Sequence, residues 1–274
     1  MATCYRHPNR ETGVSCSNCG RPICPDCMTP TSVGMRCPEC GRERTKVRTV
    51  RSLHAEPRVT YALIAINVIM FLASGQFGVS SGGGGGTILR KLALDAPDIH
   101  FQHEYWRLIT SGFLHESLLH IGFNMYLLYI LGRILEPALG SVRFGLLYLV
   151  ALLAGSAGAL LVTPDSFTVG ASGAVFGLMG ATFLAMRARG IDPMAGGIFG
   201  SIGGLIIINL VFSFAVAGIS IGGHIGGLIG GGIAALLMQY ADRLRQPALA
   251  YGGLVVLVVI AAGVGVAASA STGL

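Results

Sequence analysis

Charge is scarce in this sequence, and its scarcity excludes an ordinary soluble domain. Only 12% of the 274 residues are charged and 52% are hydrophobic, whereas soluble domains carry about a quarter charged residues. The mean hydropathy is +0.66. Many of the 41 glycines lie inside apolar runs, where they would weaken a soluble helix but where they let membrane helices approach closely. The composition therefore predicts a multi-pass membrane protein.

Cysteine is absent after residue 40, and no apolar signal segment precedes the seven cysteines of the N-terminal region. We therefore expect this region to stay in the reducing cytoplasm without a disulfide framework. With one histidine, the cysteines form four pairs, and two residues separate the members of each pair. This spacing predicts two tetrahedral Zn²⁺ sites, with a redox pair or an iron–sulfur site as the alternative. The predicted ligands are Cys4, His7, Cys16, Cys19, Cys24, Cys27, Cys37 and Cys40.

The order of these pairs along the chain suggests how they share the ions. Only four residues separate Cys19 from Cys24. This short connection favours an interleaved arrangement, in which the first and third pairs hold one ion and the second and fourth pairs hold the other. The layout resembles the B-box type of zinc finger. Such a module can recruit a cytoplasmic protein partner, sense metal or cap the N-terminus.

Apolar segments recur after the N-terminal region and a basic linker at 42–58. Each segment has close to the roughly 20 residues with which an α-helix crosses a bilayer. The seven predicted spans are 59–75, 117–136, 142–162, 169–187, 196–215, 218–239 and 249–269.

Lys and Arg are unevenly distributed around these spans. Ten of the 19 lie before residue 59, and a basic cluster directly before a span is typical of its cytoplasmic flank. The short even-numbered connections carry arginines, whereas the short odd-numbered ones carry neither Lys nor Arg. The positive-inside rule therefore predicts a cytoplasmic N-terminus and an extracytoplasmic C-terminus in the cell membrane. A basic cluster can also bind nucleic acid, but its place beside a span argues against a nucleic-acid partner.

Polar residues inside membrane spans are costly and need an explanation. His120 and Asn124 in the second span, Ser172 in the fourth and His224 in the sixth all lie near the N-terminal, outer end of their spans. The four residues therefore share one depth. Gly227 and Gly231 lie three and seven residues after His224. They can face Gly173 and Gly177 in the fourth span, so that the two helices can approach closely.

A serine beside a histidine predicts nucleophilic catalysis, because an imidazole within hydrogen-bond reach activates a weak hydroxyl nucleophile. The backbone N–H of Ser172, the Asn124 amide and His120 are candidate donors to an oxyanion. No Asp or Glu lies at this depth, so a Ser172–His224 dyad without a third member is predicted. Each residue alone also has a structural interpretation in helix packing, and the histidines have a further one as metal ligands.

The ordered set of motifs resembles the rhomboid family of intramembrane serine proteases. The resemblance covers about residues 59–240 and includes Trp106 and Arg107 in the first loop. The motifs that carry it are YWRLIT, HESLLHIGFN, GRILEPALG, GASG and GHIGG.

The resemblance implies an all-α membrane protein with a six-helix proteolytic core at 59–240. It leaves an extra C-terminal transmembrane helix at 241–274. The zinc-binding module at 1–41 is predicted separately from its Cys and His pairs. The resemblance also implies Ser172 as nucleophile, His224 as general base, His120 and Asn124 as oxyanion contacts, and Trp106 with Arg107 as a structural pair.

The expected function is a serine endopeptidase that cuts transmembrane protein substrates near the outer leaflet of the lipid bilayer, with no cofactor in catalysis. Phe176 stands where some members carry tyrosine and can still stack on the His224 ring. Two alternatives remain at this point. One is a non-catalytic protein that binds client helices, and the other is a transporter with a polar pathway.

Overall fold

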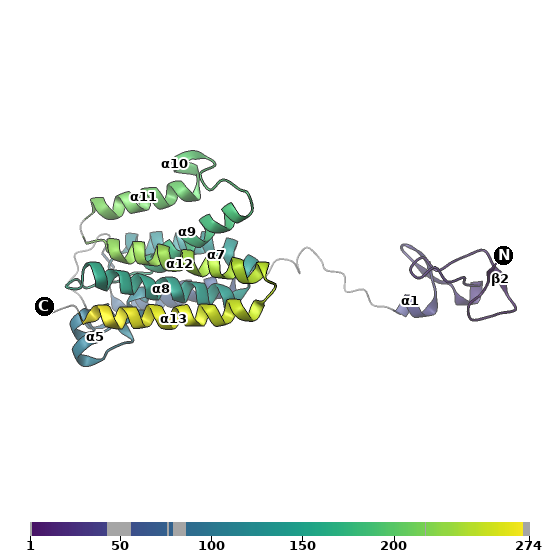
Figure 1. The fold of residues 1–274 in the computed structure, drawn as a ribbon, viewed down its shortest axis with the longest axis horizontal. Helices are drawn as coiled ribbons and strands as arrows, with labels where there is room; N and C mark the ends of the chain where they lie inside the picture. The colour runs from purple at the N-terminus through teal and green to yellow at the C-terminus, as the bar shows by residue number, and fades with distance from the viewer. Residues whose placement is uncertain (1, 43–55, 76, 79–85, 217, 271–274) are drawn as a thin grey trace. The chain divides into compact units, whose positions relative to one another are not determined.

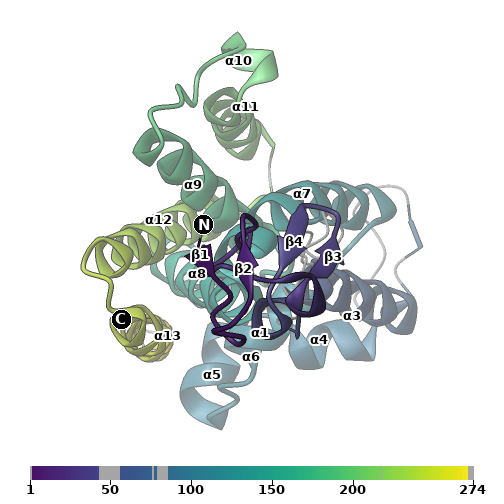
Figure 2. The ribbon, with the colours of Figure 1, turned by 90° about the vertical axis from the view of Figure 1, so that its right-hand side faces the viewer.

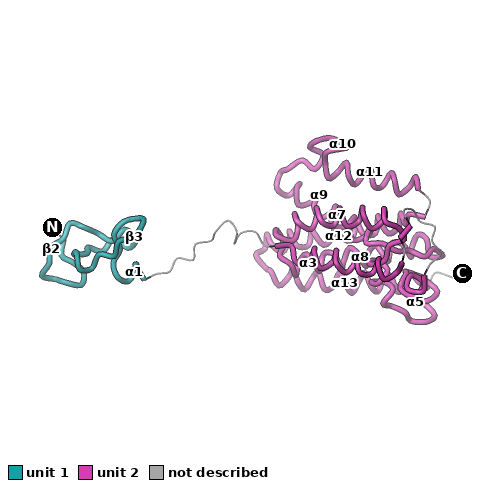
Figure 3. The backbone as a smooth tube through the Cα atoms, turned by 180° about the vertical axis from the view of Figure 1, so that it is seen from behind, with its two compact units in different colours: residues 1–54 teal, residues 55–274 magenta. Residues whose placement is uncertain are grey.

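The computed structural model describes residues 2–42, 56–75, 77–78, 86–216 and 218–270. The chain divides into two compact units, Met1–His54 and Ala55–Leu274 (Figure 3). Most of the basic linker predicted at 42–58 lies outside the described residues.

The N-terminal unit is built around sulfur rather than around a hydrocarbon core. Strand β1 (Ala2–Thr3) pairs antiparallel with β2 (Glu11–Thr12), and β3 (Thr29–Thr31) with β4 (Gly34–Arg36). The 3-10 helix η1 (Pro25–Cys27) and helix α1 (Pro38–Arg42) complete the described elements. Its buried cluster consists of six cysteines and Ile23. So small an apolar cluster supplies little folding free energy, and this is the situation in which a bound metal supplies the rest.

Apolar helices make up most of the described part of the second unit, as Figure 1 shows. Four of them, α7, α8, α12 and α13, are long and apolar enough to cross a membrane, and α3, α9 and α11 are shorter. Their bounds are α3 (Arg58–Ser74), α7 (Leu118–Leu139), α8 (Ser141–Val162), α9 (Ser172–Ala188), α11 (Ile202–Ala215), α12 (Ile221–Arg243) and α13 (Pro247–Ser269). The connections add α4 (Thr87–Leu92), α5 (Ala96–Gln102), α6 (Arg107–Thr110), the 3-10 helix η2 (Ser111–Phe113) and α10 (Gly197–Gly200).

The predicted fold class is confirmed: an all-α membrane bundle of seven apolar helices with a small N-terminal module. The largest difference lies at the start of the fifth predicted span. The helix predicted from residue 196 is divided into α10 and α11, because Ser201 has extended backbone and its side chain caps α11 by accepting from the Gly204 N–H. Ser117 and Ser220 cap α7 and α12 in the same way.

Helix α8 lies at the centre of the bundle, packed against α9, α12 and α13. Twelve of its 22 residues are buried, whereas only five of the 23 residues of α13 are. Seen end-on, α11 lies at the outer edge of the bundle beyond α9 (Figure 2). The central position of α8 makes it the support on which α9 and α12 are placed.

Helices α9 and α12 approach at backbone distance. A Cβ added to Gly227 would lie 2.0 Å from the carbonyl oxygen of Gly173, and one added to Gly231 would lie 2.3 Å from that of Gly177. Any side chain at Gly227 or Gly231 would therefore push the helices apart. This is the close glycine contact that the sequence predicts for the fourth and sixth spans.

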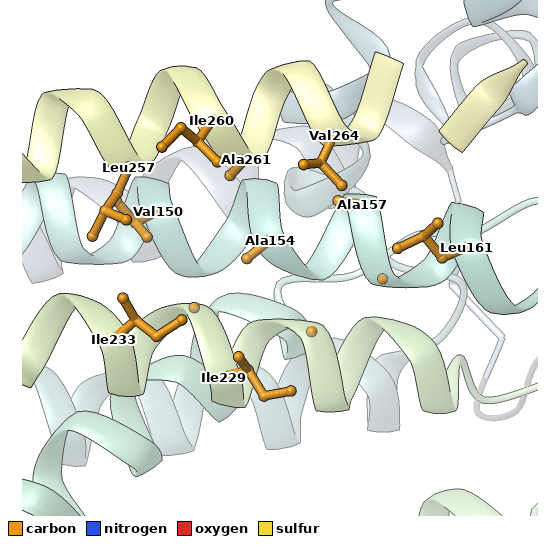
Figure 4. Close-up of a pocket in the computed structure, with 13 residues that line it drawn as sticks. Val150, Ala154, Ala157, Leu161, Ile229, Ile233, Leu257, Ile260, Ala261 and Val264 are labelled. Carbon is orange, nitrogen blue, oxygen red and sulfur yellow. The ribbon is translucent and has the colours of Figure 1, made fainter. Parts of the chain in front are cut away.

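An apolar pocket lies between α8, α12 and α13 (Figure 4). Val150, Ala154, Ile229, Ile233 and Leu257 are among the residues that line it. All the side chains that line it are aliphatic, and glycines complete the lining. A surface of this kind suits lipid chains and offers no group for recognition or chemistry.

Gly231→Ala tests the glycine contact. The new methyl group would meet the backbone of Gly177, so we expect the free energy of unfolding to fall by about 1–3 kcal/mol, measured by thermal unfolding in detergent. Gly263→Ala on α13 is the matched control, because nothing lies within 4 Å of its added Cβ. The control should keep or gain stability, since alanine favours a helix over glycine. Equal stability of the two variants would contradict this packing.

Candidate active site

Ser172 and His224 meet at the N-terminal ends of two helices. Ser172 is the first residue of α9, and His224 lies in the first turn of α12. The Ser172 Oγ lies 2.8 Å from Nε2 of His224, which is hydrogen-bond distance. The His224 side chain is buried, and Ser172 is half-buried. The structure thus brings together the two residues that the sequence pairs as nucleophile and base.

The turn before α9 determines where this helix begins. Gly170 has a φ of +125°, which residues with a side chain rarely adopt, and its N–H donates to the Ser111 carbonyl over 2.9 Å. Thr168 forms an antiparallel bridge with Leu94. These contacts hold residues 168–170 out of the helix, which therefore starts at Ser172 and not at the predicted residue 169. The backbone N–H groups of its first turn are left without partners inside the helix.

Three side chains hold the His224 ring. Ser172 contacts Nε2, and the Phe176 ring stacks on the imidazole with centroids 4.2 Å apart and planes at 19°. The third contact comes from α11, where Ser213 Oγ lies 2.6 Å from Nδ1 of His224. Phe176 thus stacks on the His224 ring, as expected from its position in the sequence.

Ser213 is the site residue that the sequence pattern did not reveal. The polar residues that the sequence pattern indicates lie at the N-terminal ends of the second, fourth and sixth spans. Consecutive spans alternate in direction, so the C-terminal end of the fifth span lies at the same depth. Ser213 stands near that end of α11, four residues after Asn209, and this pair of polar residues in an apolar helix was the available signal.

The two predicted oxyanion residues of α7 differ in position. The His120 ring lies beside the serine turn, because a Cβ added to Gly170 would be 2.6 Å from His120 Nε2 and 3.7 Å from Ser172 Oγ. The Asn124 amide instead donates to the carbonyl of His120 in its own helix, over 3.0 Å. The ring of His115 packs edge-on against His120, with centroids 4.9 Å apart. The structure thus brings the His120 ring close to the serine, whereas the Asn124 amide is hydrogen-bonded within α7.

Arg107 organises the first loop that supports this turn. Its buried guanidinium forms ion pairs with Asp98 and Glu104, each at 2.6 Å. It also donates to the carbonyl oxygens of Arg90 and Ala93, each over 2.8 Å. Ala93 precedes the residue that bridges to Thr168, so the loop and the serine turn are connected through the backbone. The neighbouring Trp106 is exposed, as expected of a side chain at a membrane interface.

The eight cysteine and histidine side chains of residues 2–42 form two groups. Cys4, His7, Cys24 and Cys27 make one group, and Cys16, Cys19, Cys37 and Cys40 make the other. In each group the ligand atoms lie within 4.8 Å of one another. This is the interleaved grouping expected from the sequence.

The distances within these groups fit a tetrahedral ion. Zn–N and Zn–S bonds of about 2.1 and 2.3 Å at tetrahedral angles separate nitrogen from sulfur by about 3.6 Å and two sulfurs by about 3.8 Å. His7 Nδ1 lies 3.3, 3.5 and 3.9 Å from the sulfurs of Cys24, Cys27 and Cys4, and Cys19 Sγ lies 3.8 Å from Cys37 Sγ. The backbone N–H of Cys37 donates to Cys16 Sγ and that of Cys40 to Cys37 Sγ. Such N–H donors stabilise the thiolates of the second group. The distances in both groups suit Zn²⁺.

Comparison with known proteins agrees with the geometry. The family model described as Rhomboid domain matches residues 102–241, which are more than half of the chain. The matched region includes Arg107, the serine turn, Ser172 and His224.

Individual relatives match over parts of their length. Rhomboid protease GluP of Bacillus subtilis is 37% identical over 196 residues, which are 70% of this chain and 37% of that protein. RHOMBOID-like protein 6, mitochondrial, of Arabidopsis thaliana is 45% identical over 94 residues, which are 34% of this chain and 31% of that protein. The chain therefore spans about a third of the length of these two relatives. On the family model and the first of these relatives together, this chain belongs to the rhomboid family.

Proposed function

We propose that this chain is an intramembrane serine endopeptidase that hydrolyses peptide bonds of transmembrane substrates. The observation that carries the proposal is the 2.8 Å contact between Ser172 Oγ and His224 Nε2 at the ends of two apolar helices. A serine hydroxyl becomes an effective nucleophile when such a base lies within reach. The similarity to Rhomboid protease GluP supports the same reaction class.

The groups of the site act in turn in the proposed reaction. His224 takes the Ser172 proton through Nε2 as Oγ attacks the carbonyl carbon of the scissile bond. The first-turn N–H groups of α9 and the His120 ring donate to the oxygen that becomes negatively charged. His224 then gives its proton to the leaving amine, which leaves an ester on Ser172. His224 then takes a proton from a water molecule that attacks this ester, and it returns that proton to the departing Ser172 oxygen, which frees the enzyme.

Asn124 is assigned to the same oxyanion site. One N–H of its amide donates to the His120 carbonyl in the structure, and the second N–H of the same amide is the proposed donor to the oxyanion. The bond to His120 ties this amide to α7, whereas the N–H groups of α9 are held in place by the helix itself.

The substrate must present an extended segment, because peptide groups inside a helix are hydrogen-bonded and shielded. We propose that a substrate helix unwinds locally and that its strand enters near the first and fifth loops. The partial exposure of Ser172 is consistent with access from one side. Water must also reach this depth, since the lipid supplies none.

The orientation follows from the arginines at the short connections. We propose a cytoplasmic N-terminus and an extracytoplasmic C-terminus in the cell membrane, which places Ser172 near the outer leaflet. Residues 59–240 form the proteolytic core in this proposal, residues 241–274 add a transmembrane helix, and the Trp106–Arg107 pair has a structural role in the first loop.

The N-terminal module at 1–41 is proposed to hold one Zn²⁺ ion in each of its two ligand groups. The ions would supply the folding free energy that its small core lacks. The proposed reaction uses protein groups alone, so the zinc has no part in catalysis. A cytoplasmic protein partner is the proposed ligand of this module.

Labelling of Ser172 tests the proposed enzyme. A fluorophosphonate probe should label the wild-type protein in detergent, and Ser172→Ala should abolish labelling because the attacking oxygen is lost. His224→Ala should slow labelling by about 10²–10⁴-fold, since it removes the general base. Cleavage of a reporter transmembrane substrate should follow the same order. His103→Asn is the control, because His103 is exposed in the first loop and hydrogen-bonds to Tyr105.

Absence of both labelling and cleavage would contradict the proposed function. If the folded wild-type protein is neither labelled nor able to cleave the reporter, the enzyme proposal is wrong. Capture of the same transmembrane segment by both wild type and Ser172→Ala, without cleavage, would then favour a client-binding protein.

Metal analysis of the full chain tests the zinc module. We expect about two zinc ions per chain, one for each ligand group. Cys16→Ser should remove one ion and leave the group of Cys4 filled, whereas Ser172→Ala should keep both. Probe labelling of Ser172 should persist in Cys16→Ser. An unchanged zinc content in Cys16→Ser would count against the assigned ligands.

A further inference from the structure

The Nδ1 side of the His224 ring faces a hydroxyl from a third helix. Ser213 Oγ lies 2.6 Å from His224 Nδ1, and it also lies 2.7 Å from the carbonyl oxygen of Asn209 one turn earlier in α11. Ser213 is 2% exposed. Among the residues that the structure describes, no Asp or Glu is hydrogen-bonded to this ring. The contact therefore occupies the position that an orienting carboxylate holds in a three-membered serine hydrolase site.

The number of protons determines the direction of these hydrogen bonds. A serine hydroxyl has one proton to donate and lone pairs that accept. The Asn209 carbonyl can only accept, and Ser213 donates to it. Ser213 therefore has only a lone pair to offer His224, and Nδ1 must be the nitrogen that carries the proton.

This arrangement selects one of the two neutral forms of histidine. With the proton on Nδ1, the lone pair of Nε2 points toward the Ser172 hydroxyl 2.8 Å away. Only this form can take the Ser172 proton. The other form would present an N–H to Ser172 and could not act as its base.

The same lone pair serves the next step. When His224 accepts the Ser172 proton, both ring nitrogens carry hydrogen and the ring is positively charged. The Ser213 oxygen still accepts from Nδ1, and a hydrogen bond to a charged donor is stronger than one to a neutral donor. Ser213 therefore stabilises the ring more after proton transfer than before it.

We propose that Ser213 is a positioning residue that holds His224 in the Nδ1-protonated form and supports its positive charge, so that a Ser172–His224–Ser213 relay spans α9, α12 and α11. This inference rests on the proposed protease function and adds a third member to its site.

Removal of the hydroxyl gives the first test. Ser213→Ala should lower the rate of Ser172 labelling and the kcat for the reporter substrate by about tenfold to a hundredfold, the effect of a lost hydrogen bond to a charged group. The KM should stay the same, because Ser213 contacts the base and not the substrate. Ser213→Thr should restore most of the rate, since threonine in a helix also bonds the carbonyl four residues earlier.

Thr182→Ala is the matched control. Thr182 is a buried helix residue whose hydroxyl donates to the Leu178 carbonyl four residues earlier, over 2.8 Å. It shares the local bonding of Ser213 without the contact to His224. This control should keep the wild-type labelling rate. Wild-type rates in Ser213→Ala, or equal losses in Ser213→Ala and Ser213→Thr, would overturn the proposal.

Nitrogen NMR of ring-labelled histidine gives a readout that does not depend on activity. The His224 signals, identified by their absence in His224→Ala, should show a protonated Nδ1 and an unprotonated Nε2 in the neutral wild-type protein. Ser213→Ala should shift this population toward the other form. A protonated Nε2 in the wild type would overturn the inference even if the protein labels. Failure of labelling in a wild type with the expected NMR signals would instead count against the protease function alone.

Discussion

The close approach of α9 and α12 is the constraint on which the rest of this structure depends. Lipid chains are as apolar as leucine, so no hydrophobic force pushes membrane helices together, and contact between backbones must hold them. Gly227 brings α12 so close to α9 that an added methyl would lie 2.0 Å from a backbone oxygen. The Ser172–His224 hydrogen bond tolerates only a few tenths of an ångström of change. The reactive contact is therefore a consequence of glycine packing about one helical turn along α12 from His224.

The helices could be predicted from sequence because the bilayer imposes their length. Seven apolar runs became seven apolar helices. The starts were less accurate, since they depend on local backbone contacts that hydrophobicity does not report. Ser201 ends α10 and caps α11, a signal that a serine before an apolar run does carry. The start of α9 depends on the bond from Gly170 to Ser111 and on the bridge of Thr168 to Leu94, and no sequence pattern gives such long-range contacts.

Some residues of the candidate site could also be predicted from sequence, whereas others could not. The contact of Ser172 with His224 followed from shared depth and glycine spacing, and the zinc ligands grouped as their order along the chain suggested. Ser213 could not be paired with His224 in advance, because the rotation of α11 about its axis decides which residue meets the ring. The Asn124 amide was expected at the serine but bonds within its own helix. Depth can be read from sequence, whereas side-chain direction requires the packed bundle.

In the proposed site, uncharged hydroxyl groups of Ser172 and Ser213 flank the His224 ring, and no carboxylate is used. The low polarity of the membrane explains this choice. A carboxylate at this depth would lose its hydration at a cost that only a close partner could offset. The Ser213 hydroxyl avoids that cost, because its proton is already bonded to the Asn209 carbonyl and its lone pair meets a ring N–H. A hydroxyl stabilises the charged ring less than a carboxylate would. This difference is offset because Ser213 and His224 are buried, and a hydrogen bond in surroundings of low polarity is stronger than one in water. A hydroxyl in a buried site of low polarity can therefore orient the histidine as a carboxylate does in a site exposed to water.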